Sequence, residues 1–346
     1  MKGRSVHLDS WNGRLAAAML VDGQLDDLLI APPDDRPQPG AIYRATVDRP
    51  LKGQGGVTVR LPHGRGFLKK AKGLAPGQDL VVQVTGYAEP GKAPPVTARP
   101  LFKSRHVIVT PDAPGYNVSR SVRDDDRRDA LLAIAHEVAG PPDRIGLILR
   151  SAAAEADDGE IAEDIAATLE LAEQLQTDSG TGPELLFDGP DPHMLAWRDW
   201  PMPDALFGEP GNFVDHGILD HIDLLASSHA ELGSHGWISV EPTRALVAVD
   251  VNTGGDSSLA AGLKTNIAAA RALPAQLRCR GLGGQITIDF APCPKKDRRT
   301  IEQILRAAFR TCPVDTVLAG WTPLGAFELQ RKRDRLPLHE LPEVHP

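Results

Sequence analysis

The sequence is poor in cysteine. Its three cysteines, Cys279, Cys293 and Cys312, are odd in number and show no Cys-x-x-Cys spacing. This pattern argues against a disulfide framework and against structural zinc, and it favours the reducing cytoplasm. The sequence also lacks the run of roughly 18 apolar residues that a membrane-spanning helix needs. Residues 15–21 are apolar but end at Asp22 without a cleavage site, so we expect a strand there and not a signal peptide.

An excess of positive charge is also missing. The formal net charge is −8, which argues against a protein that coats nucleic acid indiscriminately. Lysine and arginine nevertheless gather locally, within residues 69–72, 295–299 and 331–335. Hydrophobic residues make up 41% and charged residues 24%, which is typical of an ordinary globular protein. The length of 346 residues predicts about two domains.

Two aspartates each follow a short apolar run. Residues 245–249 lead into Asp250, and residues 285–288 lead into Asp289. Residues 259–280 lie between them and carry apolar side chains at helical spacing. A strand, helix, strand unit places its strands parallel, so that both carboxyl ends emerge at one edge of the sheet. We therefore expect the two aspartates to lie close enough to share Mg²⁺.

An ordinary interpretation competes with this one. An aspartate after a strand is more often a turn former or a helix cap than a metal ligand. Two aspartates in one crossover unit, with Asn252 beside the first, make the metal site an equal alternative.

A small barrel is predicted upstream. Residues 14–30 favour a hairpin that turns at Asp22 and Gly23, and the proline-rich residues 32–40 indicate a boundary. Five short β segments within residues 41–100 predict a closed barrel of the oligonucleotide-binding type. Such barrels stack bases on aromatic side chains and follow the backbone with basic ones. Phe67, Lys69 and Lys70 are the candidates, although a phenylalanine is more often a core residue.

Two other polar groups are candidates for binding phosphate. Residues 145–149 form a predicted strand, between predicted helices at 124–139 and 157–175, that ends in Arg150 and Ser151. A guanidinium beside a hydroxyl can bind a phosphate, but it can equally be the ordinary polar end of a strand. After Asp289, a basic run opens a predicted helix at 300–309 close to the carboxylate edge. Lys295, Arg298 and Arg299 are the candidates there for neutralising backbone phosphates.

Together these parts resemble the ribonuclease E/G family. The resemblance is carried by residues 245–252 (ALVAVDVN), 276–284 (QLRCRGLGG), 286–290 (ITIDF) and 323–331 (PLGAFELQR), and it extends over nearly the whole chain. It implies an α+β fold of several subdomains. These are an RNase H-like part in two pieces (1–39 and 181–225), an inserted OB-type RNA-binding barrel (40–100), a 5′-sensor region (101–180) and an α/β DNase I-like nuclease subdomain (226–346).

The resemblance also implies an activity. Members of the family are endoribonucleases of RNA processing that cut single-stranded RNA with Mg²⁺, for which Mn²⁺ can substitute. By this resemblance Asp250 and Asp289 hold the metal, and Asn252 helps to hold the scissile phosphate. Arg150 and Ser151 fall where the family binds a 5′ monophosphate with an Arg and a Thr. Phe67 matches an RNA-contacting aromatic of the barrel.

The sequence departs from the family pattern in three places. A second barrel aromatic is missing at residues 56–59, and Pro274 is expected to interrupt the helix between the aspartates, at a cost of about 3 kcal/mol. The paired-cysteine segment that links subunits through zinc is also missing. We therefore expect a short form without zinc or a scaffold region, as a monomer or weak dimer. Two alternatives stay open: an RNA-binding protein of this fold with weak or lost catalysis, and a metal-dependent deoxyribonuclease or phosphodiesterase.

Overall fold

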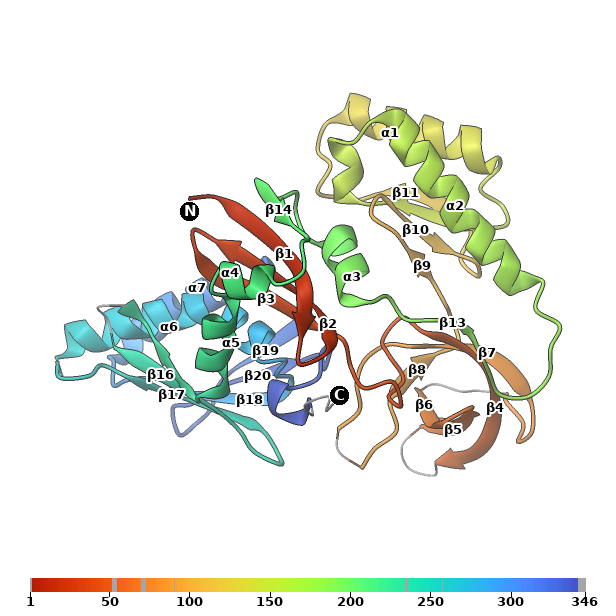
Figure 1. The fold of residues 1–346 in the computed structure, drawn as a ribbon. Coiled ribbons are helices and arrows are strands. Elements are labelled where there is room, and N and C mark those ends of the chain that lie inside the picture. The colour runs from red at the N-terminus through yellow and green to blue at the C-terminus, as the bar shows by residue number, and fades with distance from the viewer. Residues whose placement is uncertain are drawn as a thin grey trace. The chain divides into compact units, whose positions relative to one another are not determined.

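The chain forms two compact units in its computed structural model. The first comprises Met1–Pro33 and Met202–Pro346, and the second Asp34–Pro201 (Figure 1). The structure describes residues 2–51, 55–69, 73–89, 91–233, 236–256 and 258–341. Among these residues no helix combines the length and apolar composition that crossing a bilayer requires.

A closed five-stranded barrel begins the second unit, as predicted. Strand β4 pairs with β5 on one side and β7 on the other, and β8 lies between β6 and β7, which closes the sheet. Alternate valines, such as Val47, Val59 and Val82, fill its interior. Strand β13 pairs with the first residues of β4, Ile42 to Arg44, which precede those that pair with β5. The strands are β4 (Ile42–Leu51), β5 (Gly56–Leu61), β6 (Gly64–Lys69), β7 (Asp79–Val84), β8 (Pro95–Thr97) and β13 (Glu184–Phe187).

A four-stranded sheet with two long helices follows in the same unit. Its order is β11-β12-β10-β9, and its apolar residues pack with those of α1 and α2 in one core. Asp124 caps α1 by accepting a hydrogen bond from the backbone N–H of Arg127. The two helices and β12 match the predicted segments closely. The elements are β9 (Phe102–Lys103), β10 (Val107–Thr110), β11 (Gly115–Val118), α1 (Asp125–Ala139), β12 (Gly146–Leu149), η1 (Ser151–Ala154), α2 (Asp158–Gln176) and α3 (Pro192–Asp199).

The first unit opens with a four-stranded sheet of order β14-β1-β2-β3. The predicted hairpin is present as β2 and β3, and Asp22 adopts a positive φ of 51° in its turn. Strand β1 was not predicted. It pairs with β2 on one side and, on the other, with β14, which follows about 200 residues later in the sequence. The elements are β1 (Arg4–Trp11), β2 (Arg14–Val21), β3 (Gln24–Ile30), β14 (Ala205–Phe207), α4 (Asn212–Asp215) and α5 (Ile218–Ala226).

A six-stranded sheet completes this unit, in the order β15-β16-β17-β18-β20-β19. Its buried valines and isoleucines share one core with the apolar faces of α6 and α7. The elements are β15 (His229–Glu231), β16 (Trp237–Pro242), β17 (Val247–Asn252), α6 (Leu259–Cys279), β18 (Gly284–Asp289), η3 (Lys295–Asp297), α7 (Arg298–Arg310), β19 (Thr316–Trp321), β20 (Phe327–Arg331) and η4 (Leu338–Glu340).

Two local predictions in this sheet are wrong. Pro274 does not interrupt its helix: α6 continues through it to Cys279, with the proline ring buried. The apolar environment of this ring offsets the missing backbone hydrogen bond. The first strand also does not end at Asp250, because β17 pairs with β16 as far as Asn252. The α+β class and the barrel are confirmed, while the finer division into five segments stays a prediction.

Candidate active site

The two aspartates face each other across neighbouring strands. β17 and β18 are parallel, and their register pairs Val249 with Ile288 and then Asp250 with Asp289. Val249 and Ile288 are buried in the core with α6 and α7, whereas both aspartates are exposed. Because side chains alternate along a strand, both carboxylates project from the face opposite the helices, on strands about 4.8 Å apart. The expected proximity of Asp250 and Asp289 is therefore present.

Asn252 orients the first carboxylate. Its Nδ2 donates a hydrogen bond of 2.7 Å to Oδ2 of Asp250. The two residues are two positions apart in β17 and so share one face of the sheet. The end of this strand is held by a close approach of Gly236, whose φ is +103° and where a Cβ would lie 2.1 Å from the Asn252 carbonyl oxygen. The structure thus assigns Asn252 a positioning contact that the sequence did not predict.

The segment after the second carboxylate is clamped to α6. Asn266 is fully buried; its Nδ2 donates to the Ala291 carbonyl at 2.8 Å, and its Oδ1 accepts from the Ala291 N–H at 2.9 Å. Gly262, one turn earlier on α6, has no room for a side chain, because a Cβ would lie 2.5 Å from the Pro292 carbonyl oxygen. These contacts fix the chain two residues beyond Asp289. In the sequence Asn266 looked like an ordinary polar position of a helix.

The predicted basic residues lie at the end of the segment that joins β18 to α7. Lys295 and Arg299 are exposed, on η3 and at the start of α7. The Arg298 guanidinium carbon lies 4.7 Å from the centroid of the Trp321 ring, a cation–π contact. Trp321 in turn packs against Phe290, with ring centroids 5.5 Å apart. Arg298 is therefore held through Trp321 against the residue that follows Asp289.

The donor set fits magnesium. Among the residues that the structure describes, no group of three or more His, Cys, Asp or Glu side chains could hold a metal ion. Mg²⁺ does not require such a cage, because one or two carboxylates with waters and substrate phosphates complete its octahedral shell. Asp250 and Asp289 supply two adjacent, exposed carboxylates of this kind.

Phe67 lies on the barrel strand β6 and is partly exposed. Its ring covers Gly56 of β5, where a Cβ would lie 2.8 Å from ring atoms Cε2 and Cζ. The second barrel aromatic is missing from β5, and in this strand Gly56 leaves the space that the Phe67 ring occupies. Lys69 is exposed at the end of β6, and Lys70 lies outside the described residues.

Arg150 and Ser151 lie together at the end of β12, and Ser151 is exposed. The Arg150 guanidinium donates to Oδ1 of Asp199 at 2.8 Å and to the backbone carbonyls of Ser104, Arg105 and Arg198. Burial lowers the pKa of Arg150, and the charge of Asp199 opposes this shift. Arg150 is therefore committed to an internal ion pair with Asp199, a partner that the sequence did not reveal.

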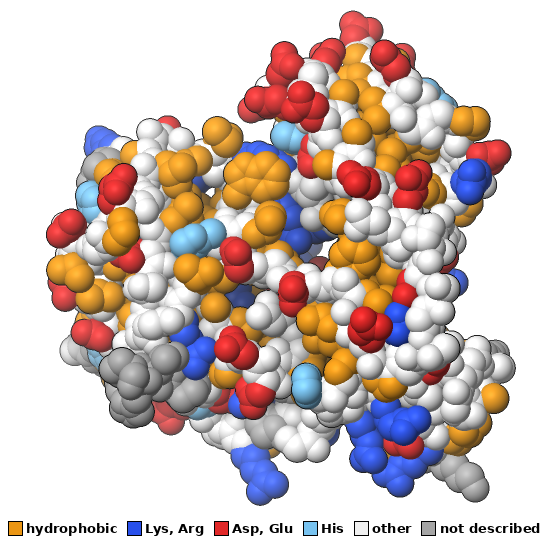
Figure 2. All heavy atoms as spheres, turned by 45° about the vertical axis from the view of Figure 1, so that its right-hand side comes forward, with side chains coloured by type: hydrophobic (Ala, Val, Ile, Leu, Met, Phe, Trp, Pro, Cys, Tyr) orange, Lys and Arg blue, Asp and Glu red, His pale blue; other side chains and the backbone are white. Residues whose placement is uncertain are grey.

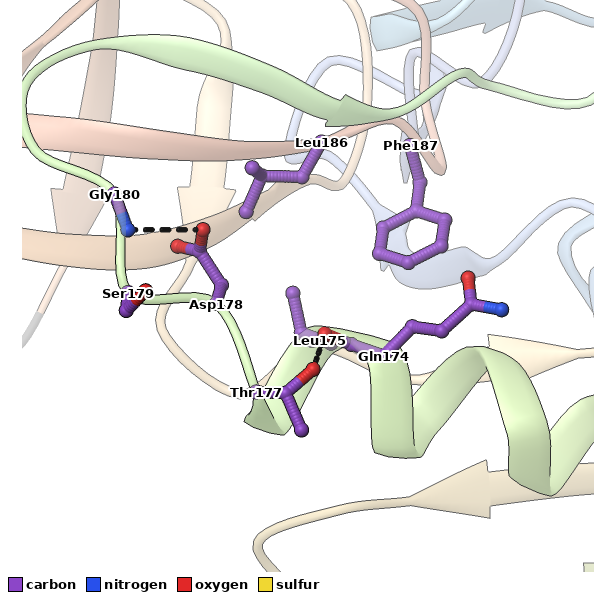
Figure 3. A pocket seen from close by; sticks show the side chains of 8 residues that line it. All are labelled: Gln174, Leu175, Thr177, Asp178, Ser179, Gly180, Leu186 and Phe187. Carbon is purple, nitrogen blue, oxygen red and sulfur yellow. Dashed lines mark hydrogen bonds between the residues drawn. The ribbon is translucent and has the colours of Figure 1, made fainter.

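One cavity, of about 330 Å³, lies in the second unit between the end of α2 and β13 (Figure 3). Its most polar group, the Asp178 carboxylate, accepts a hydrogen bond of 2.8 Å from Nε of the buried Arg44. None of the predicted site residues lines it, so we assign it no ligand. Its lining residues are Gln174, Leu175, Thr177, Asp178, Ser179, Gly180, Leu186 and Phe187.

A comparison with protein-family models finds one family that matches a large part of the chain. The model described as the ribonuclease E/G family matches residues 102–205 and 207–334, which together are more than half of the chain. The chain belongs to the ribonuclease E/G family. The matched residues include Asp250, Asn252 and Asp289, whereas Phe67 and Lys69 precede them.

Individual members of the ribonuclease E/G family are similar at moderate identity. Ribonuclease E of Nostoc sp. (strain PCC 7120) is 27% identical over 383 residues, covering 94% of this chain and 55% of the relative. Ribonuclease E of Synechocystis sp. (strain PCC 6803) is 26% identical, covering 82% of this chain and 48% of the relative. Ribonuclease G of Escherichia coli (strain K12) is 28% identical over 297 residues, covering 75% of this chain and 60% of the relative. The chain thus spans about half to three fifths of the length of these relatives.

Proposed function

We propose that this protein is a Mg²⁺-dependent endoribonuclease that cuts single-stranded RNA in RNA processing. The observation that carries the proposal is the register of β17 and β18, which sets Asp250 directly beside Asp289 on the exposed face of the sheet. Relatives named as ribonucleases E and G support RNA as the substrate. Mn²⁺ has the same preference for oxygen ligands and substitutes for Mg²⁺.

We assign each side chain of the candidate site a separate role according to its position. Asp250 and Asp289 would hold the ion, and Asn252 fixes the orientation of the Asp250 carboxylate through the 2.7 Å hydrogen bond. When bound, the ion supplies charge stabilisation at the phosphate and lowers the pKa of a water ligand. Lys295 and Arg299 neutralise neighbouring backbone phosphates without reading the base sequence. Water attacks phosphorus in line and gives up a proton to solvent, while the bond from phosphorus to the 3′ oxygen breaks and that oxygen takes up a proton. The products therefore carry a 5′ phosphate and a 3′ hydroxyl.

A cleavage assay tests this proposal. A single-stranded RNA should be cut internally in Mg²⁺, cutting should stop when a chelator is added, and excess Mg²⁺ should restore it. The downstream products should carry 5′ phosphates, as read by mass spectrometry. Binding without cleavage in Mg²⁺ or Mn²⁺ would favour the alternative, an RNA-binding protein with lost catalysis. A DNA strand cut as fast as the RNA would favour the deoxyribonuclease or phosphodiesterase reading.

Sensitivity to the 5′ end is a finer part of the proposal. Ser151 presents an exposed hydroxyl beside Arg150, and a 5′ phosphate would compete with Asp199 for the guanidinium. We expect faster cleavage of an oligonucleotide with a 5′ monophosphate than of the same oligonucleotide with a 5′ hydroxyl. Ser151→Ala should narrow the difference and Arg150→Gln should remove it, with thermal melting as the control for folding. Equal rates in the unaltered protein would refute 5′ sensing and leave the catalytic proposal standing.

Two further expectations belong to the same proposal. The free cysteines Cys279, Cys293 and Cys312 motivate a cytoplasmic location and a state that is not linked through zinc, as a monomer or weak dimer. Sedimentation of the protein with and without a chelator tests the second of these, because a zinc-linked oligomer would dissociate when the metal is removed.

A further inference from the structure

Helix α3 exposes a large aromatic side chain. Trp197 is 53% exposed, and Met194, three residues earlier on the same helix, is 50% exposed. The opposite side of the helix carries the buried Pro192 and Ala196. Tryptophan is highly buried on average, so a ring left more than half exposed is unusual.

An arginine is fixed beside this ring. The guanidinium carbon of Arg105 lies 5.9 Å from the centroid of the Trp197 ring. The same guanidinium donates hydrogen bonds to the backbone carbonyls of Trp197 and Trp200, at the C-terminal end of α3. Capping the helix end explains the position of Arg105. It does not explain why the Trp197 ring stays more than half exposed.

Three more cations lie around one carboxylate at the same helix end. Asp199 contacts Lys103 Nζ at 2.7 Å, Arg150 Nη2 at 2.8 Å and Arg198 Nη2 at 2.7 Å. Burial alone would raise the pKa of Asp199, but Arg198 and Lys103 outweigh burial and lower it to about 2. Asp199 is therefore ionised at neutral pH. Four cations, Arg105 included, lie at this helix end, and they outnumber Asp199 and Asp164, which accepts from the His106 N–H on the β9–β10 connection.

This local excess opposes the charge of the whole chain. The formal net charge is −8, and on the face shown in Figure 2 acidic side chains are widely scattered while lysine and arginine gather in a few groups. Proteins that bind single-stranded nucleic acid combine basic side chains, which follow the backbone, with aromatic rings on which bases stack.

We propose that α3 and the β9–β10 connection form a contact surface for single-stranded RNA, separate from the barrel. Trp197 stacks one nucleobase, and Lys103 and Arg105 bind the phosphates on either side of it. This inference rests on the proposed RNA substrate, and it adds a base-stacking residue that contacts RNA independently of the chemistry of the 5′ end.

Binding of a labelled RNA tests the inference without interference from cleavage. The parent for the experiment is the full chain with Asp250→Asn, and the probe is a fluorescent single-stranded oligoribonucleotide with a 5′ hydroxyl, followed by anisotropy. Trp197→Ala should weaken binding about 5- to 150-fold, the range for loss of one base–aromatic stack. Trp197→Phe should keep most of the affinity. Met194→Ala, which changes the neighbouring exposed side chain, is the matched control and should bind as the parent does.

Salt dependence tests the phosphate contacts separately. Lys103→Gln should reduce the slope of log affinity against log salt by about 0.7, the contribution of one phosphate contact to a single strand. Unchanged affinity of Trp197→Ala, or equal losses in Trp197→Ala and Met194→Ala, would overturn the inference. Self-association of the RNA-free parent that Trp197→Ala abolishes would overturn it too, since the patch would then join two copies. The proposed function is tested by a different measurement, the Mg²⁺-dependent cleavage of RNA by the unaltered chain, so the two can fail separately.

Discussion

Asp250→Asn and Asp289→Asn should each reduce Mg²⁺-supported RNA cleavage about a thousand-fold. The exchange keeps the size of the side chain and removes one of the two carboxylates that the register of β17 and β18 brings together. Metal stabilisation of the reacting phosphate contributes several kcal/mol, and a loss of about 4 kcal/mol corresponds to about three powers of ten in rate. Single-turnover cleavage of one RNA in Mg²⁺ measures the effect.

Substitutions of two neighbouring residues provide comparisons for the aspartate variants. Asn252→Ala removes the hydrogen bond that orients Asp250 and should slow cleavage about 10- to 100-fold, as is usual for residues that position metal ligands. Gln285→Ala alters another exposed side chain on the same face of β18 and should leave the rate unchanged. If either aspartate variant folds normally and cleaves at close to the native rate, the metal site is placed wrongly.

Asp27→Asn should lower the free energy of unfolding by about 3–5 kcal/mol, the loss typical of breaking a buried ion pair. Asp27 lies on β3 and is only 1% exposed. Both of its carboxylate oxygens accept from the Arg335 guanidinium, and Arg278 Nε lies 3.3 Å from Oδ1. Asparagine keeps the shape of the side chain but leaves two largely buried guanidinium groups short of a counter-charge. Urea unfolding followed by tryptophan fluorescence measures the change.

The adjacent aspartate provides the control. Asp26 also pairs with Arg278, at 2.8 Å, but it is 39% exposed on its side chain. Exposed pairs contribute about 1 kcal/mol or less, so Asp26→Asn should have a much smaller effect. If Asp27→Asn and Asp26→Asn lower the free energy of unfolding equally, burial does not explain the contribution of the Asp27 ion pairs.

The centre of the candidate site follows from local patterns. A strand, helix, strand unit can pair its strands in parallel over a short sequence separation, so the positions of Asp250 and Asp289 were predictable from periodicity and handedness. The expectation for Pro274 was wrong because helix propensity is a weak prior that tertiary burial overrides. The barrel was predictable for a similar reason, since its strands alternate and its turns carry glycine.

Apart from the hydrogen bond between Asn252 and Asp250, the supporting contacts could not be predicted, because each joins residues distant in sequence. Asn266 reaches the backbone of Ala291 across the crossover, and Arg150 reaches Asp199 from 49 positions away. Nothing in the periodicity of either segment marks the partner. The same holds for β1, which pairs with β14 across some 200 residues. Sequence patterns therefore located the carboxylates but not the residues that hold them and their surroundings in place.

The central claim is that Asp250 and Asp289 bind one hard cation directly, and a change of ligand chemistry tests it. Cysteine is a soft ligand that Mg²⁺ disfavours and softer ions accept. Asp289→Cys and Asp250→Cys should each lose cleavage of single-stranded RNA in Mg²⁺ and regain part of it when Cd²⁺ is added. Full activity of either variant in Mg²⁺ alone would contradict the claim. So would a loss of cleavage that Cd²⁺ restores in neither variant.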